Sequence, residues 1–299
     1  MVNWSVCVAL MLTAVVMLSV VAYAQQPMRS LLLAYGNVSA LGAEGGNVTG
    51  LVNELNEAIT LYAAGHYANA SALASGIIAS APSLAKAIEL RRIELYSTYA
   101  AVGGIALIIV SLAYLKRREL IGGLWLRFRG GGMVTVGGGK PRGFITDEEV
   151  LAVVTAVALV FAVFLITQAL VSGEAAPFSA IGLLGPGGKI GGYPSVVSVN
   201  QSINLYLLVY NHMNRPVWYV VYVYVTNTTA SPPIGGEPVL VYQRVLLSNE
   251  TWITPLSLSL NETGDFRIVG ELWMYSPVNL TLTYTGDYVQ LWVNVTNYG

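Results

Sequence analysis

The stretch from Ser202 to Val225, SINLYLLVYNHMNRPVWYVVYVYV, decides the fold, because aliphatic residues recur in it at every second position. Side chains of a β-strand alternate between its two faces, so this spacing predicts two strands. In the first strand, one face carries Ile203, Leu205, Leu207 and Val209. In the second strand, one face carries Val217, Tyr219, Val221, Val223 and Val225.

The same alternation continues to the end of the chain. In Tyr288–Thr296, one face carries Val289, Leu291, Val293 and Val295, and Gly286-Asp287 just before it has the composition of a two-residue turn joining two strands. Residues 173–299 have the size of one immunoglobulin-like domain. We therefore predict an extracytoplasmic sandwich of seven or eight strands in two layers.

Residues 177–225 resemble an archaeal membrane-protein family, domain of unknown function 1616. The matching residues are Leu184-Gly185-Pro186, Gly188-Lys189, Tyr193-Pro194, the Val196–Val199 strand and Asn211-His212 at a strand end. The resemblance implies membrane helices joined to an extracytoplasmic sandwich. The family has no established activity, so the resemblance implies an architecture and no chemistry.

The composition indicates a membrane protein. Hydrophobic residues make up 55% of the chain and charged residues 10%, whereas soluble domains carry about 25% charged residues. Three apolar runs stand out, Val6–Ala24, Tyr99–Leu115 and Val150–Ser172, and about 20 residues suffice to cross a bilayer as a helix. We predict transmembrane helices at 98–115 and 149–172, which makes the chain an α+β membrane protein.

The first apolar run resembles a secretory signal. It ends in Ala22-Tyr23-Ala24, a small-residue cleavage pattern, although no Lys or Arg precedes it. Residues 1–24 are therefore either a cleaved signal peptide or a retained first membrane helix. Both alternatives place residue 25 outside the cell.

Charge and glycosylation acceptors indicate the topology. The segment 116–148 holds seven of the fifteen Lys and Arg residues, which is typical of a cytoplasmic loop. It contains no asparagine, whereas N-x-[ST] acceptors occur on both sides of it. We therefore predict a multi-pass plasma-membrane protein with 25–97 and 173–299 outside. The candidate glycosylation sites are Asn37, Asn47, Asn69, Asn200, Asn227, Asn249, Asn261, Asn279 and Asn294.

The glycine-rich part of this loop, residues 127–144, is not a phosphate-binding loop. That motif needs a glycine where Val134 stands and a hydroxyl where Pro141 stands. One interpretation is a hairpin with glycine turns whose Lys and Arg side chains contact anionic lipid head groups. The alternative is a docking site for a cytoplasmic partner.

The segment 51–82 resembles a single tetratricopeptide-type helical hairpin. Gly65, Tyr67, Ala70 and Pro82 stand at the spacings of that repeat, in which small residues allow close helix packing and the proline ends the unit. A second copy does not follow. The resemblance implies a helical hairpin that caps a helix from Leu84 to Leu115, with peptide binding as the alternative.

Residues that carry chemistry are scarce. The chain has two histidines, His66 and His212, and its single cysteine, Cys7, lies in the first apolar run. A Cys/His metal site is therefore not expected, and no cofactor is predicted. The outer carboxylates show no spacing that selects a catalytic pair. We predict that the protein is not an enzyme and does not bind nucleic acid.

One row of aromatic residues is a candidate contact surface. Trp218, Tyr222 and Tyr224 should share the strand face opposite Val221 and Val223. They form either a surface for a protein or sugar, or a second buried face of the sandwich, or a contact with the membrane interface.

These observations predict a non-catalytic, membrane-anchored cell-surface binding or scaffold protein. Besides the lipid bilayer, its expected partner is another envelope or membrane protein, or a glycan. The alternative is an accessory subunit of a membrane enzyme complex, in which a partner supplies catalysis.

Overall fold

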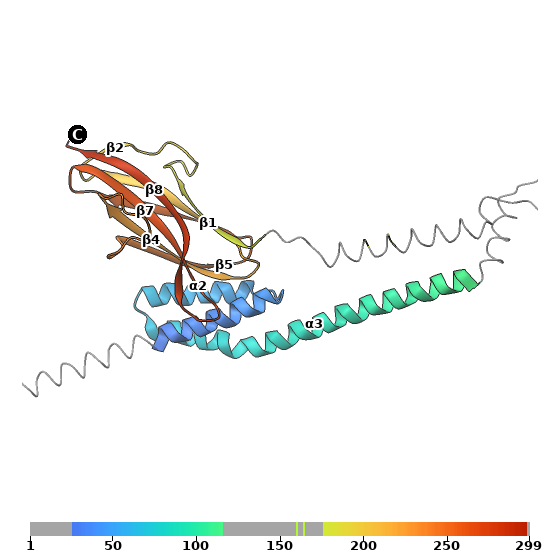
Figure 1. Cartoon of the computed structure of the whole chain (residues 1–299). Coiled ribbons are helices and arrows are strands. Elements are labelled where there is room, and N and C mark those ends of the chain that lie inside the picture. The colour runs from blue at the N-terminus through green and yellow to red at the C-terminus, as the bar shows by residue number, and fades with distance from the viewer. Residues whose placement is uncertain (1–25, 116–159, 161–163, 165–175, 298–299) are drawn as a thin grey trace, which may run out of the picture. The chain divides into compact units, whose positions relative to one another are not determined.

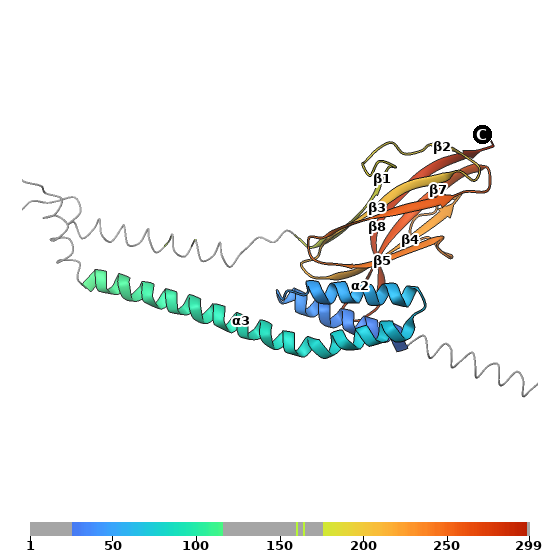
Figure 2. The same ribbon diagram turned by 180° about the vertical axis from the view of Figure 1, so that it is seen from behind.

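The computed structural model describes residues 26–115, 160, 164 and 176–297. The chain divides into two compact units, one that joins Met1–Glu89 to Pro177–Gly299 and one that comprises Leu90–Ala176. Figures 1 and 2 show the first unit from opposite sides, with helices packed against a β-sandwich. The sequence predicted the helical segment and the sandwich as separate domains, and the structure shows that they form one unit.

Three helices follow one another in residues 26–115. The first covers residues 26–43, α2 covers Thr49–Ala63 and α3 covers Tyr67–Leu115. Glycines end the first two helices. Gly45 and Gly65 take positive φ angles of 82° and 84°, and the residue after each donates its N–H to a carbonyl five residues back, as in a Schellman motif. The break predicted at Gly65-His66 is confirmed.

The end predicted at Pro82 is wrong, because Pro82 lies inside α3. A proline removes one helical hydrogen bond and strains the preceding turn, at a cost of about 3 kcal/mol. Packing on both sides of Pro82 offsets that cost: Ile77 and Ala81 are buried in the helical core, and Leu84 and Ile88 pack against it. Tertiary contacts therefore keep the helix continuous.

The sandwich has eight strands in two sheets. The strands are β1 Phe178–Leu184, β2 Val196–Ser198, β3 Ser202–His212, β4 Val217–Thr226, β5 Leu240–Leu246, β6 Thr251–Ser259, β7 Gly264–Tyr275 and β8 Leu282–Thr296. One sheet has the order β1-β3-β6 and the other β2-β8-β7-β4-β5. In chain order this is the A, B, E and A′, G, F, C, C′ arrangement of an immunoglobulin-like sandwich. The predicted sandwich fold is thus confirmed.

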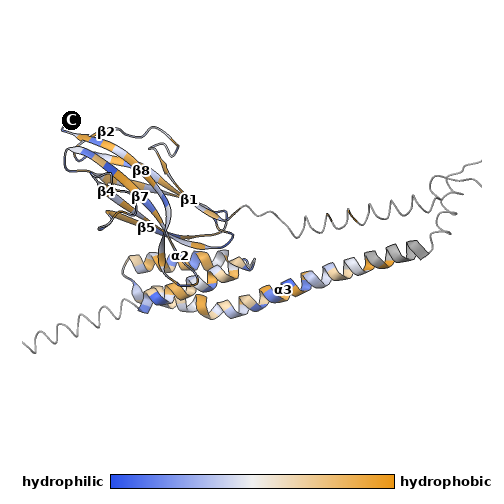
Figure 3. Cartoon of the chain, viewed as in Figure 1, coloured by the Kyte–Doolittle hydropathy of each residue, from blue (hydrophilic) through white to orange (hydrophobic). Residues whose placement is uncertain are grey.

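The core between the sheets consists of the residues predicted to face inward. In β3 the buried side chains are Ile203, Leu205, Leu207 and Val209, and in β4 they include Val217, Tyr219, Val221 and Val223. Val293 and Val295 of β8 are buried in the same core, and Val289 and Leu291 pack against it. Figure 3 shows apolar residues along the strands and the helices, and a cluster of hydrophilic residues part-way along α3.

The turn predicted at Gly286-Asp287 is wrong. Both residues lie inside β8, where Tyr284 pairs with Trp273 and Tyr288 pairs with Glu271. Three residues of β8 therefore stand opposite Leu272, which makes a β-bulge. Gly286 takes a φ of 92°, and Thr285 donates its hydroxyl to the Leu272 carbonyl at 2.8 Å. Glycine at this position allows the bulge where the sequence pattern predicted a hairpin.

Among the described residues, one helix is long and apolar enough to cross a membrane, the part of α3 from Tyr67 to Ile105. The criterion is the length of the helix and the hydropathy of its residues. The predicted signal at 1–24 and the basic loop at 116–148 lie outside the described residues, as does the predicted helix at 149–172 except for Val160 and Phe164.

Candidate functional site

The predicted aromatic row lies on the outer face of the five-stranded sheet, and the chain itself covers it. Trp218 is 1% exposed and belongs to the helical core together with Val220 and Val245. Its ring stands 5.9 Å from that of Tyr35 in an edge-on geometry and 4.7 Å from that of Tyr275. The helices therefore occupy the contact surface that the sequence offered to a partner at Trp218.

Polar contacts also join the helices to this sheet. The Tyr35 hydroxyl donates to the Tyr275 carbonyl at 2.9 Å, and the Ser39 hydroxyl donates to the Pro216 carbonyl at 2.9 Å. Tyr35 and Tyr275 are 240 positions apart in the sequence. Burial raises the pKa of both tyrosines, that of Tyr275 to about 12, so their hydroxyls stay protonated at neutral pH.

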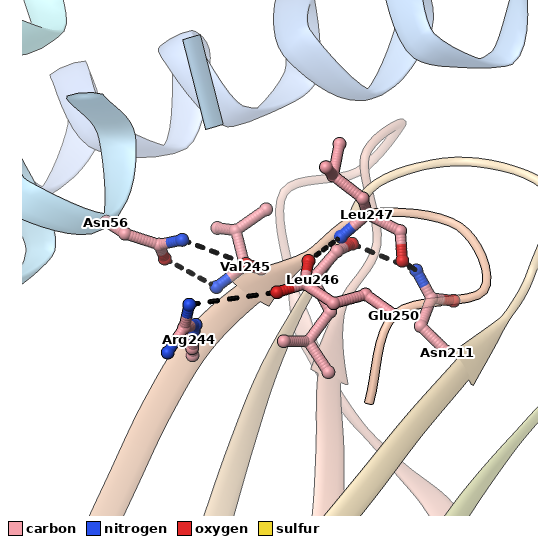
Figure 4. Close-up of polar contacts among 7 residues, drawn as sticks. All are labelled: Asn56, Asn211, Arg244, Val245, Leu246, Leu247 and Glu250. Carbon is pink, nitrogen blue, oxygen red and sulfur yellow. Dashed lines mark hydrogen bonds and ion pairs between the residues drawn. The ribbon is translucent and has the colours of Figure 1, made fainter. Parts of the chain in front are cut away.

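The edge of the five-stranded sheet is closed by a side chain of α2. Asn56 donates its Nδ2 to the carbonyl of Val245 at 2.9 Å and accepts the Val245 N–H on Oδ1 at 2.7 Å (Figure 4). Val245 lies on β5, the last strand of that sheet. Asn56 thus makes the two hydrogen bonds that a further strand would otherwise make.

A second part of the outer face, around Tyr224 and Glu271, lies under the loop between β4 and β5, residues 227–239, whereas Val241 and Trp292 on the same face are exposed. Glu271 is fully buried; its carboxylate accepts the Ile234 N–H at 2.6 Å and the Trp273 indole N–H at 3.1 Å. Arg267 donates to the Ala230 carbonyl at 2.7 Å. Tyr224 is 8% exposed. These contacts attach the loop to the sheet, and they occupy both oxygens of the Glu271 carboxylate.

Tyr222 and Tyr224 are part of the same packed layer. The Tyr222 ring meets that of Trp273 at 5.8 Å, and Trp273 meets Tyr284 at 5.4 Å. Burial is the first cause that raises the pKa of Tyr222 and of Tyr224 above its usual value; for Tyr224 the nearby Glu271 adds to it. These rings serve as packing for the helices and the loop.

The outer face of the other sheet is different. Strands β1, β3 and β6 contain no Asp, Glu, Lys or Arg. Phe178 is 47% exposed and Ile253 is 53% exposed. We call this surface the free face; it is formed by Phe178, Ala180, Gly182, Tyr206, Leu208, Tyr210, His212, Ile253 and Pro255.

The sequence contained a signal for the free face that the prediction did not use. Outward positions of a solvated strand are usually polar or charged, but those of β3 include Tyr206, Leu208 and Tyr210. The prediction concentrated instead on the aromatic residues of β4. The first helix was also missed, although Leu31, Tyr35 and Val38 repeat at helical spacing.

Asn211 organises the end of the sandwich where β3 and β5 finish. It is fully buried, and the two hydrogens of its Nδ2 are shared among the carbonyls of Arg215, Leu246 and Leu247, each at 2.9 Å. Figure 4 draws the contacts with Leu246 and Leu247. Its Oδ1 accepts the Tyr219 hydroxyl at 3.1 Å. This network explains why an asparagine stands at the strand end that the sequence analysis singled out.

His212, the next residue, lies at the corner of the free face. Its Nδ1 is 2.6 Å from Oδ1 of Asn249, and the Tyr210 hydroxyl donates to the same oxygen at 3.3 Å. The Phe178 ring lies 5.0 Å from the His212 ring and 5.9 Å from the Tyr210 ring. Three rings and a candidate glycosylation site are therefore in contact. His66, by contrast, is exposed in the turn between α2 and α3.

The described residues contain no group of three or more His, Cys, Asp or Glu side chains placed to hold a metal ion. Asp265 accepts the Nδ2 of Asn294 at 2.6 Å, which ties it to a neighbouring strand.

No protein-family model matches the chain, so the resemblance to domain of unknown function 1616 stays a prediction. No curated protein matches its sequence. Among solved structures, the CARDB domain of a Pyrococcus furiosus protein is similar, with 17% identity and a TM-score of 0.30 over 41% of this chain and 90% of that domain. A β-glucosidase from Listeria innocua is similar with 16% identity and a TM-score of 0.30, over 41% of this chain and 16% of the enzyme.

Proposed function

We propose that the chain is a non-catalytic, membrane-anchored cell-surface protein that binds another envelope or membrane protein through the free face. The observation that carries this proposal is the contrast between the two sheets. Helices and a loop of the same chain cover the aromatic part of the outer face of one sheet, around Trp218, Tyr224 and Glu271. The other sheet exposes an uncharged face on which apolar residues such as Phe178, Leu208 and Ile253 lie beside polar residues such as Asn204 and Ser257.

The anchor is supported by α3. Within the span predicted at 98–115, this helix carries large exposed apolar side chains, which are Tyr99, Ile105 and Ile108. Exposed rows of this kind are normally covered by lipid or protein. With a second span at 149–172 and a basic cytoplasmic loop between the spans, the sandwich lies outside the cell.

The edges of the sheets support contact through a face. Asn56 occupies the edge of β5, Pro255 interrupts the edge strand β6, and β2 has only three residues. Short strands, prolines and covered edges oppose strand addition. Strand addition is therefore disfavoured at β2, β5 and β6, and we expect a partner to bind the free face.

The chemistry of the free face favours a protein partner. Leu208 and Ile253 are aliphatic and offer no hydrogen bonds, and they pair across the β3–β6 ladder. Uncharged apolar centres are typical of protein interfaces. A ligand recognised through charge would require cations or carboxylates, which these three strands lack.

The test is a pull-down in which the detergent-solubilised full chain is mixed with isolated cell envelopes, and the fraction of the chain that binds to the envelopes is measured. Ile253→Arg should lower the fraction of the chain bound to envelopes at least tenfold, because it places an unpaired charge within the face, next to Leu208. Val241→Arg is the matched control, since Val241 is 51% exposed on the outer side of the other sheet. Equal binding by Ile253→Arg and the unaltered chain would contradict the proposal.

A further inference from the structure

The structure sorts the nine candidate glycosylation sites by their local conformation. Six lie in loops and turns, which are Asn47, Asn200, Asn227, Asn249, Asn261 and Asn279. Asn37 and Asn69 lie in helices. Asn294 lies in β8, and its Nδ2, the atom that a glycan would occupy, donates to Asp265 at 2.6 Å. A surface loop is the usual context of an occupied acceptor.

Asn249 differs from the other loop acceptors in how its side chain is held. It is exposed, lies in the turn between β5 and β6, and takes a φ of 62°. Its Oδ1 contacts Nδ1 of His212 at 2.6 Å and the Tyr210 hydroxyl at 3.3 Å. Oδ1 and Nδ2 branch from Cγ in different directions within one plane, so with the oxygen held against the sandwich Nδ2 points away from these contacts. Thr251, which completes the acceptor motif, is also exposed.

Three aromatic rings lie beside Asn249. We call Phe178, Tyr210 and His212 the aromatic shelf. The Tyr210 and His212 rings are nearly parallel, with an interplanar angle of 19°, and Phe178 lies within 6 Å of both. The apolar faces of such rings pack against the C–H faces of a sugar, while their polar edges accept or donate hydrogen bonds.

We propose that Asn249 is N-glycosylated and that its first sugar residues lie on the aromatic shelf. In the transfer, Nδ2 of Asn249 forms a bond to C1 of a lipid-phosphate-linked oligosaccharide. The bond between C1 and the phosphate oxygen breaks, the lipid phosphate leaves with the electron pair, and Nδ2 loses one proton to a base of the transferase. The glycan then covers Phe178, Tyr210 and His212 at one end of the free face and leaves Leu208 and Ile253 for the protein partner.

This inference rests on the proposed function, which places the sandwich outside the cell. Its first test is mass spectrometry of peptides from the full chain purified from its own cells. We expect a glycan on Asn249 and none on Asn294. An unmodified Asn249 would overturn the inference, whether or not other sites are occupied, and would leave the envelope-binding test with Ile253→Arg unaffected.

The second test asks whether the glycan lies on the shelf. Thr251→Ala removes the acceptor motif but keeps Asn249 and its contacts with His212. We expect it to lower the Tm in the unaltered chain and to have a much smaller effect in a Phe178→Ala background. Asn261→Gln, which removes a loop acceptor distant in sequence from the shelf, should show no such dependence on Phe178. Equal Tm losses from Thr251→Ala in both backgrounds would overturn the placement of the sugar.

Discussion

Asn56 and Val245 are joined by two hydrogen bonds, so that a helix side chain completes the edge of a β-sheet. The pair is 189 positions apart in the sequence. It connects the helical part of the chain to β5 and, through the neighbouring Leu246 and Leu247 carbonyls, to the buried Asn211 (Figure 4). The helices are therefore fastened to the end of the sandwich at which β3 and β5 finish.

Asn56→Ala should destabilise the protein by about 2 kcal/mol, because it leaves the partly buried N–H and carbonyl of Val245 without these partners. The measurement is a urea denaturation curve of the full chain in detergent. Asn204→Ala is the control: Asn204 is exposed and accepts one hydrogen bond, from Ser257 at 2.7 Å. If the two substitutions cost the same, the edge contact has no special role.

Trp218→Ala should cost about 3–5 kcal/mol of unfolding free energy, as expected for a large buried side chain. Trp218→Phe should cost much less, since within the described residues the indole N–H has no hydrogen-bond partner. Trp292→Ala is the matched control on the same sheet, because Trp292 is 42% exposed. A mild effect of Trp218→Ala would restore the hypothesis that this row is a surface for partners.

Gly185→Ala should disrupt the loop between β1 and β2. A Cβ at this position would stand 2.1 Å from the Gly191 carbonyl oxygen, so the backbone would have to move. Gly187→Ala should be tolerated, because nothing lies within 4 Å of its Cβ position. Limited proteolysis of the loop measures the difference. Equal cleavage rates of the two variants would count against the close packing of Gly185 on Gly191.

The stability of the sandwich should fall at alkaline pH because of Tyr219. Burial raises the pKa of Tyr219 from 10.0 to about 12, and its hydroxyl contacts Ser179 at 2.6 Å. The folded pKa is above the unfolded one, so this stabilisation is complete below pH 10.0 and is lost as pH rises toward about 12. In denaturation curves across this range, Tyr219→Phe should lose less stability with pH than the unaltered chain. Parallel pH profiles would contradict the assignment.

The topology of the proposed function predicts which positions react with a membrane-impermeant thiol reagent in intact cells. In a Cys7→Ser background, Ser231→Cys should be labelled and Val136→Cys should not, because the basic loop faces the cytoplasm. Val136→Cys should become reactive once the membrane is permeabilised. Labelling of both positions in intact cells would rule out the arrangement with two spans.

The inward faces of the strands could be predicted from the sequence because they depend on local spacing. The alternation in 202–210, 217–225 and 288–296 is set by strand geometry, and the buried residues follow it. The break at Gly65 is likewise local, since a positive φ is easiest for glycine. The bulge at Gly286 shows where prediction from local sequence ends. A glycine with positive φ suits both a turn and a bulge, and the contact with Leu272 on the neighbouring strand decides between them.

The outer faces, in contrast, were decided by contacts between distant parts of the chain. Trp218 and Tyr206 are both aromatic and both point away from the inter-sheet core, and nothing within their own strands says which will be covered. Trp218 is buried because Tyr35, far away in the sequence, packs against it, and Tyr206 stays partly exposed because no described helix lies over its sheet. Pro82 stays helical for the same reason. Local spacing determines which side of a strand faces inward, and the free energy of long-range packing determines which remaining surface is left for a partner.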